Sequence, residues 1–131
     1  MPNGTMTDVK NGLQRPDDVL ETQWADLCQW AAQTFHRAVS VDGLLFLIGL
    51  QETHTSPKRR LEKETKQDLI VEGSFHVLAA LGFYQRTETE PFWQPLAPLP
   101  RLNVDEQEKL LRMGLIRYFE QTGAYVGLGG V

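Results

Sequence analysis

The sequence predicts an all-α domain, a compact bundle of about four helices around a buried central helix, with a proline-rich connection before the last helix. Three observations favour this fold. Residues 43–50, GLLFLIGL, form an uncharged apolar run whose one β-branched residue, Ile48, makes a strand less favourable than a helix. Apolar residues recur at helical spacing on both sides of this run. Four prolines gather within residues 91–100, which disfavours a helix or a central strand there.

The central helix is expected over residues 41–53. Ser40 or Asp42 can cap its start, because a short polar side chain accepts a hydrogen bond from an otherwise unpaired amide. A segment that is apolar all round must lie among other helices, and this one is too short for a bilayer, which needs about 20 apolar residues. Gly43 and Gly49 either let neighbouring helices approach closely or are tolerated at a cost of about 1 kcal/mol each relative to Ala.

The first helix is expected over residues 17–38. Pro16 and the two aspartates after it are typical of a helix start. The helix carries an apolar stripe at spacings of three and four, formed by Leu20, Trp24, Leu27, Ala31, Phe35 and Ala38. Because so few residues join it to the central helix, we expect these two helices to be neighbours.

Two more helices are expected after the central one. The third starts at residue 58 or 62 and runs to residue 81, where Gly82 supplies the glycine that often follows a helix end. The fourth covers residues 104–121. It begins with Asn103, followed three residues later by Glu106, which is a variant of the capping box.

The chain length sets the domain organisation. A chain of 131 residues with 41% hydrophobic content is expected to form one domain with a substantial core. We predict a loose N-terminal arm at residues 1–15, a single helical domain at residues 16–122 and a glycine-rich C-terminal tail at residues 123–131.

Composition excludes several classes of function. The net charge of −4 is spread evenly along the chain and argues against a general nucleic-acid binder. The single cysteine, Cys28, excludes an intrachain disulfide and a cysteine-based zinc site. The first residues lack the basic and apolar pattern of a secretion signal, so a cytoplasmic setting is expected. No phosphate loop or hydrolase motif is present, which makes a binding protein a better expectation than an enzyme.

The proline-rich connection holds the predicted partner-binding residues, Phe92, Trp93 and Leu96. Aromatic side chains carry much of the contact area in protein and ligand interfaces, and long loops in small domains are often functional. The alternative is that these residues simply cover the core. The sequence leaves these two interpretations balanced.

Asp68, Glu72 and His76 are the candidate metal ligands. They stand four residues apart on the third helix, so their side chains share one side of it. Carboxylates and imidazoles at such spacing bind divalent metals in helical bundles. Glu52 and His54, just past the central helix, could add ligands from a second segment. A metal site needs ligands from at least two helices, so simple pairing of Glu72 with His76 is favoured.

The segments VDGLLFLIGLQE, KETKQDLI and LAALGFY together resemble a family of small, uncharacterised bacterial proteins. Its members share an apolar LLFLIGLQE run, followed by a KQDL helix that ends in glycine and two aromatic residues. The resemblance covers residues 41–84, about a third of the chain. It implies a compact bacterial cytoplasmic domain and supplies no activity, cofactor or site residue.

The expected function is therefore that of a small, non-enzymatic binding or protein-interaction module. Its partner is another protein or a second copy of the chain, as in a homodimer, and neither nucleic acid nor membrane is expected. The alternative is a metal-binding helical protein that uses the carboxylate and histidine ligands of the third helix. No cofactor other than such a metal is expected.

Overall fold

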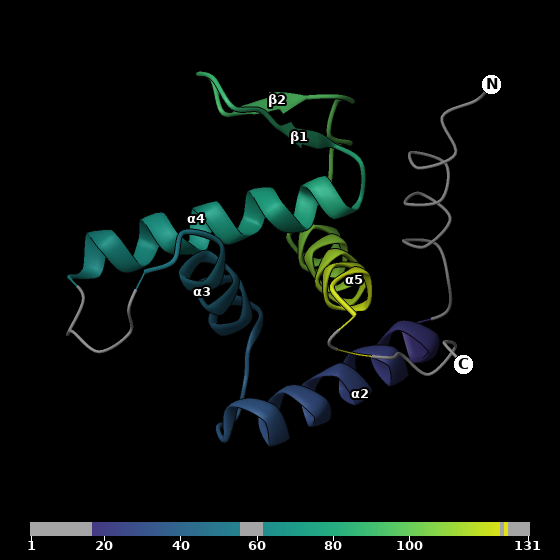
Figure 1. The fold of residues 1–131 in the computed structure, drawn as a ribbon. Helices are drawn as coiled ribbons and strands as arrows, with labels where there is room; N and C mark the ends of the chain where they lie inside the picture. The colour runs from purple at the N-terminus through teal and green to yellow at the C-terminus, as the bar shows by residue number, and fades with distance from the viewer. Residues whose placement is uncertain (1–16, 56–61, 124, 126–131) are drawn as a thin grey trace.

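The structure, a computed structural model, describes residues 17–55, 62–123 and 125. In these ranges the chain forms four helices and a two-stranded ribbon (Figure 1): α2 (Asp17–Phe35), α3 (Val41–Glu52), α4 (Lys63–Ala80), β1 (Tyr84–Arg86), β2 (Trp93–Pro95) and α5 (Val104–Gln121). The predicted all-α class is confirmed. The predicted arm at residues 1–15, and the predicted tail apart from Gly123 and Tyr125, lie outside the described residues.

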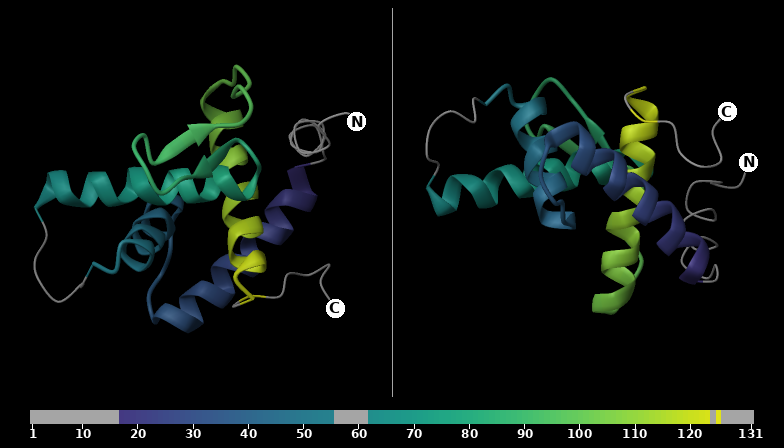
Figure 2. Two further views of the ribbon diagram at one scale, coloured as in Figure 1. Left: turned by 45° about the horizontal axis from the view of Figure 1, so that its top comes forward. Right: turned by 90° about the horizontal axis from the view of Figure 1, so that it is seen from below.

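Helix α4 is the middle layer of the fold. The ribbon covers one of its sides and α3 packs against the other, as Figures 1 and 2 show. Helix α5 crosses α4 and also contacts α3. We expected α2 to pack on α3, but α2 makes its main helix contacts with α5. The chain turns at His36, where φ is 58°, and this turn also ends α2 before the predicted residue 38.

The main hydrophobic core forms around α3. Its residues Leu44, Leu45 and Ile48 are almost fully buried and share one cluster with side chains from α2, α4 and α5. The other helices therefore bury one side of α3, whereas Phe46 and Leu47 of the same helix are only half-buried. A second, smaller cluster lies under the ribbon and consists of Leu81, Phe83 and Leu110.

The helix ends follow the sequence signals. The Ser40 side chain accepts a hydrogen bond of 3.0 Å from the Gly43 amide at the start of α3. Asn103 and Glu106 form a reciprocal capping box at the start of α5. After α4, Gly82 has a φ of 90°, the left-handed conformation that glycine adopts without steric cost.

The two-stranded ribbon is the element that the sequence analysis missed. The structure pairs β1 with β2 in antiparallel register, with Gln85 opposite Gln94 and Tyr84 opposite Pro95. Proline argued against a strand because it lacks an amide donor. In a two-stranded ribbon, however, each strand has an unpaired edge on which proline is tolerated.

Two glycines bring the backbones of α3 and α4 into contact. A Cβ atom at Gly49 would lie 2.1 Å from the Leu69 carbonyl oxygen, and one at Gly73 would lie 2.0 Å from the Leu45 carbonyl oxygen. The two contact points are one helical turn apart on each helix. Of the two central-helix glycines, only Gly49 serves close approach, because Gly43 faces its own cap residue.

Alanine substitutions test this helix crossing. We expect Gly73→Ala to lower the free energy of unfolding by about 2 kcal/mol or more, because the added methyl meets backbone that cannot move independently. Gly43→Ala is the matched control. There a Cβ meets only the Ser40 hydroxyl, at 3.2 Å, so we expect a change within about 1 kcal/mol. Urea unfolding followed by circular dichroism measures both, and equal effects would contradict the crossing.

Candidate functional site

The three predicted partner-binding residues lie on the ribbon and on the connection that follows it. Phe92 is 40% exposed and Leu96 is 58% exposed, so both are at the surface. Trp93 is half-buried. The structure thus presents two of the three side chains to solvent and turns the third toward the protein.

Trp93 attaches the ribbon to α4. Its ring stacks on Phe75, with ring centroids 5.4 Å apart and planes at 9°. It also packs perpendicular to the His76 ring, with the ring centroids 4.7 Å apart and the planes at 88°. The Arg86 guanidinium lies 5.5 Å from the Trp93 ring and 4.9 Å from the Phe92 ring. Such aromatic and cation–π contacts hold the ribbon in place beyond simple area burial.

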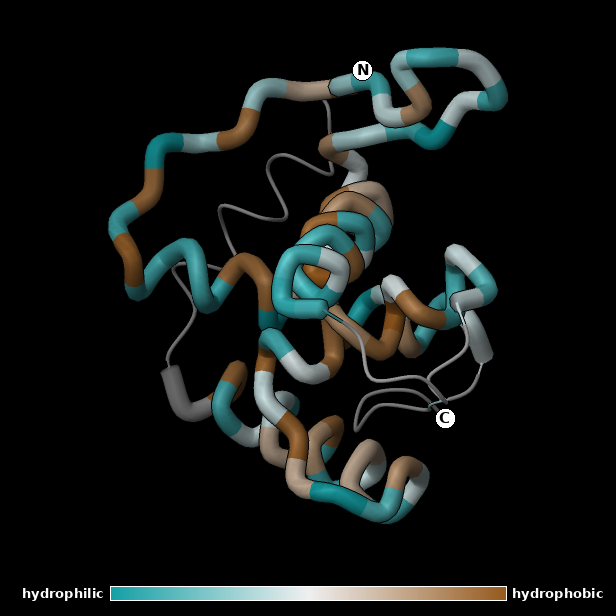
Figure 3. Tube along the Cα trace, turned by 90° about the vertical axis from the view of Figure 1, so that its left-hand side faces the viewer, coloured by the Kyte–Doolittle hydropathy of each residue, from teal (hydrophilic) through white to brown (hydrophobic). Residues whose placement is uncertain are grey.

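Exposed apolar side chains are concentrated on one short segment. Six large hydrophobic residues are exposed in the described part of the chain. Four of them fall within residues 92–104 and form what we call the apolar strip: Phe92, Leu96, Leu99 and Val104. In Figure 3 this connection is the extended arch between the ribbon and α5, along which apolar positions alternate with polar ones.

The candidate metal ligands do not converge in the structure. The Glu72 carboxylate lies 3.2 Å from His76 Nε2 and pairs with it. Asp68 is exposed and makes no such contact. On the other edge of the same ring, His76 Nδ1 lies 4.0 Å from the Glu52 carboxylate. Within residues 17–55, 62–123 and 125, no group of three or more His, Cys, Asp or Glu side chains is arranged to hold a metal ion.

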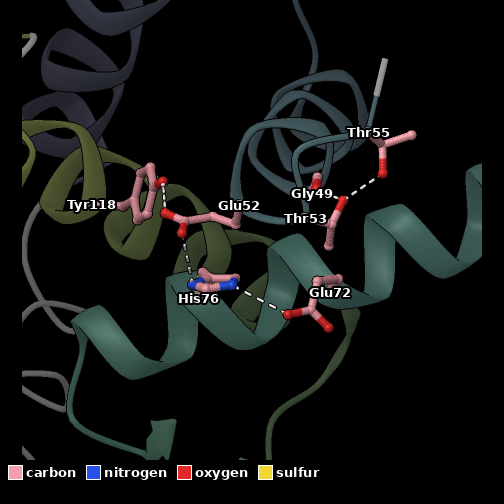
Figure 4. Close-up of polar contacts among 7 residues, drawn as sticks. All are labelled: Gly49, Glu52, Thr53, Thr55, Glu72, His76 and Tyr118. Atoms are coloured by element: carbon pink, nitrogen blue, oxygen red, sulfur yellow. Dashed lines mark hydrogen bonds and ion pairs between the residues drawn. The ribbon is translucent and has the colours of Figure 1, made fainter. Parts of the chain in front are cut away.

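Glu52, Glu72, His76 and Tyr118 instead form a polar junction between helices (Figure 4). The Tyr118 hydroxyl donates a 2.5 Å hydrogen bond to the Glu52 carboxylate. That carboxylate faces His76, and Trp93 covers the ring. The junction therefore connects α3, α4, α5 and β2 at one point.

This arrangement is better suited to holding helices together than to catalysis. A general base needs a ring nitrogen within reach of a substrate proton. Here each nitrogen of His76 faces a carboxylate of the protein itself. The nearby Tyr118 hydroxyl is already used as a donor to Glu52.

Two tyrosine hydroxyls titrate outside their ordinary range. Burial raises the pKa of Tyr118, and the hydrogen bond to Glu52 and its charge raise this pKa further. Burial and Asp26 raise the pKa of Tyr125 in the same way. Tyr125 donates a hydrogen bond to Asp26 of α2, so this residue of the predicted tail is tied to the bundle.

Comparison of the chain with protein-family models, with curated proteins and with solved structures gives no match in any of the three. In the described ranges, no helix has both the length and the apolar character needed to cross a membrane. The function must therefore be argued from the geometry of the chain itself.

Sequence reasoning missed several residues at these two places. Tyr118 is separated from Glu52 by 66 positions, and no local pattern indicates that they meet. Leu99 and Val104 are different. Both are large apolar residues close to Leu96 in the proline-rich connection. This local density of apolar residues could have indicated that they belong to the same exposed surface as Leu96.

The Tyr118 hydroxyl predicts a pH dependence of stability. A pKa that is raised on folding gives stability that is complete below the unfolded value of about 10 and is lost as the pH rises above it. We expect Tyr118→Phe to be about 1–2 kcal/mol less stable than the wild type at pH 7. It should lose less stability than the wild type from about pH 9 to pH 11.

Urea unfolding at a series of pH values measures this difference. Glu52→Gln is the companion variant, because it keeps an acceptor oxygen and removes the charge, and it should also reduce the alkaline loss. An identical alkaline loss in the wild type and in Tyr118→Phe would show that the hydroxyl is not coupled to folding.

Proposed function

We propose that this chain is a cytoplasmic, non-enzymatic protein-interaction module that binds another protein through the apolar strip. The observation that supports it most is the concentration of exposed large side chains within residues 92–104. Exposed hydrophobic residues scattered singly are ordinary on a protein surface, whereas grouped ones mark sites of interaction.

The strip is carried on an ordered backbone. Ala97 and Leu102 pack against the smaller core cluster, and the Leu96 amide donates a 2.8 Å hydrogen bond to the Phe83 carbonyl oxygen. Asn103 then caps α5. Because the segment is already ordered, a partner would not bear the full entropic cost of fixing it.

The surroundings of the strip favour a protein as partner. Exposed Arg86 and Arg101 lie on the same segment as exposed Glu88 and Glu90, and a mixed polar rim is typical of protein interfaces. The net charge of −4 disfavours a nucleic-acid backbone. A single cysteine is consistent with a reducing compartment. Self-association through the strip, as in a homodimer, is the other form of this proposal.

An acidic substitution in the strip tests the proposal. The tagged full-length chain is used to capture complexes from an extract of its own cells, and its mass in solution is measured by sedimentation. We expect a specific complex with the wild type, and at least about tenfold weaker binding with Leu96→Asp, because a carboxylate is costly to bury in an interface.

Val71→Asp is the matched control. Val71 is also exposed, at 47%, but lies on α4 outside the strip, so this variant should bind like the wild type. A wild-type chain that is monomeric and captures nothing would refute the proposal. So would a complex that Leu96→Asp leaves intact.

A further inference from the structure

The starts of α3 and α5 enclose a hollow of about 330 Å³, which we call the acidic hollow. Its carboxylates are Asp42 of α3 and Glu108 of α5, and its apolar walls include Val41, Val104 and Leu111. Val104 is also the last residue of the apolar strip and is 79% exposed. The acidic hollow and the apolar strip therefore form one continuous surface.

Asp42 is the carboxylate of this hollow that is open to a new partner. Glu108 already pairs with Arg112, whose Nη2 lies 3.0 Å from the Glu108 carboxylate. Asp42 is exposed, and within residues 17–55, 62–123 and 125 it makes no ion pair. A carboxylate beside apolar walls suits a side chain that carries its positive charge on an apolar stem, as arginine and lysine do.

Arg101 is the cation of the apolar strip that is still available. It is exposed and lies three residues before Val104, a stretch that spans at most about 11 Å. Arg86, the other arginine near the strip, is placed over the rings of Phe92 and Trp93. In the part of the chain that the structure describes, Arg101 makes neither an ion pair nor such a ring contact.

We propose that two copies of this chain form a two-fold symmetric dimer in which Arg101 of each copy enters the acidic hollow of the other and pairs with Asp42 there. A two-fold interface uses the same surface on both copies, so that surface must carry its own complement. Arg101 and Asp42 supply opposite charges on the two sides of Val104. This inference rests on the proposed function and specifies its self-association form.

The charge of the chain favours a second copy that docks in this way. Each copy carries a net charge of −4, so two copies repel each other unless the contact brings opposite charges together. The reciprocal arrangement places two Arg101–Asp42 pairs in one interface. It also brings the apolar strips of the two copies together around the same axis, which covers side chains that are otherwise exposed to water.

Charge reversal of each partner tests the dimer. Sedimentation of the full-length chain over a range of concentrations measures its dimer dissociation constant. We expect the wild type to dimerise, and Arg101→Glu and Asp42→Arg each to raise this constant at least about tenfold, because each variant places like charges opposite one another.

An equimolar mixture of the two variants is the decisive measurement. In a mixed dimer the two substituted side chains face each other with opposite charges, and the unaltered Arg101 of one chain faces the unaltered Asp42 of the other. We therefore expect the mixture to associate within about threefold of the wild type. Pairing of Arg101 with Asp42 inside one chain could not be restored by mixing.

Glu64→Arg is the matched control. Glu64 stands in the first turn of α4 as Asp42 stands in the first turn of α3, so both reversals lose a similar interaction with a helix dipole. Because Glu64 lies outside the hollow and the strip, this variant should dimerise within about twofold of the wild type. Circular dichroism checks that each variant keeps its helices. Asp42→Asn, a smaller change, should weaken the dimer at least about threefold and replaces Asp42→Arg if that variant does not fold.

Three results would overturn this dimer: a monomeric wild type, single variants that dimerise as tightly as the wild type, or a mixture that associates no better than the variants alone. The proposed function fails on different evidence. A monomeric wild type that captures another protein, and loses it in Leu96→Asp, would keep the proposed function without this dimer.

Discussion

The backbone contact between α3 and α4 fixes the geometry of the rest of the fold. Gly49 meets Leu69 and Gly73 meets Leu45, each at a distance that leaves no room for a Cβ atom. Because these contacts are one turn apart on both helices, neither helix can slide or rotate without opening one of them. The close approach brings the end of α3 beside α4, where Glu52 reaches His76. The polar junction thus depends on the glycines at positions 49 and 73, whose lack of a side chain lets the two helices approach so closely.

The sequence predicted the parts of the fold that depend on neighbouring residues. The central helix, the Ser40 cap and the Asn103–Glu106 box are local, because each involves residues within four positions of one another. Packing partners are not local. The short link between α2 and α3 indicated contact, but the left-handed turn at His36 directs α2 toward α5. The ribbon was missed because proline lacks an amide donor, which argued against a strand. Only the fold shows that Pro95 lies in a two-stranded ribbon, where each strand has an unpaired edge that needs no amide donor.

For the candidate sites, too, the sequence predicted the contacts between residues close in the chain and not those between distant residues. The spacing of Asp68, Glu72 and His76 placed them correctly on one helix, and the pairing of Glu72 with His76 follows from an interval of four residues. Asp68 is eight residues from His76, about 12 Å along the helix, which is too far to share a ligand with it. Glu52 and Tyr118 enter from other helices, and only the tertiary structure shows that they meet. Trp93 was recognised as an interacting residue, but what it contacts is this protein's own α4.

The position of Trp93 explains how a small bundle can hold an exposed connection in a defined shape. Its ring rests on Phe75 and His76 of α4, and α4 is itself held against α3 by the glycine contacts. A continuous path of packed groups therefore runs from the centre of the bundle through the ribbon to residue 95. Beyond that residue, Ala97 and Leu102 attach to the smaller cluster and the prolines restrict the backbone. The chain thus orders the segment with few of its own apolar side chains, which leaves Leu96 and Leu99 facing solvent.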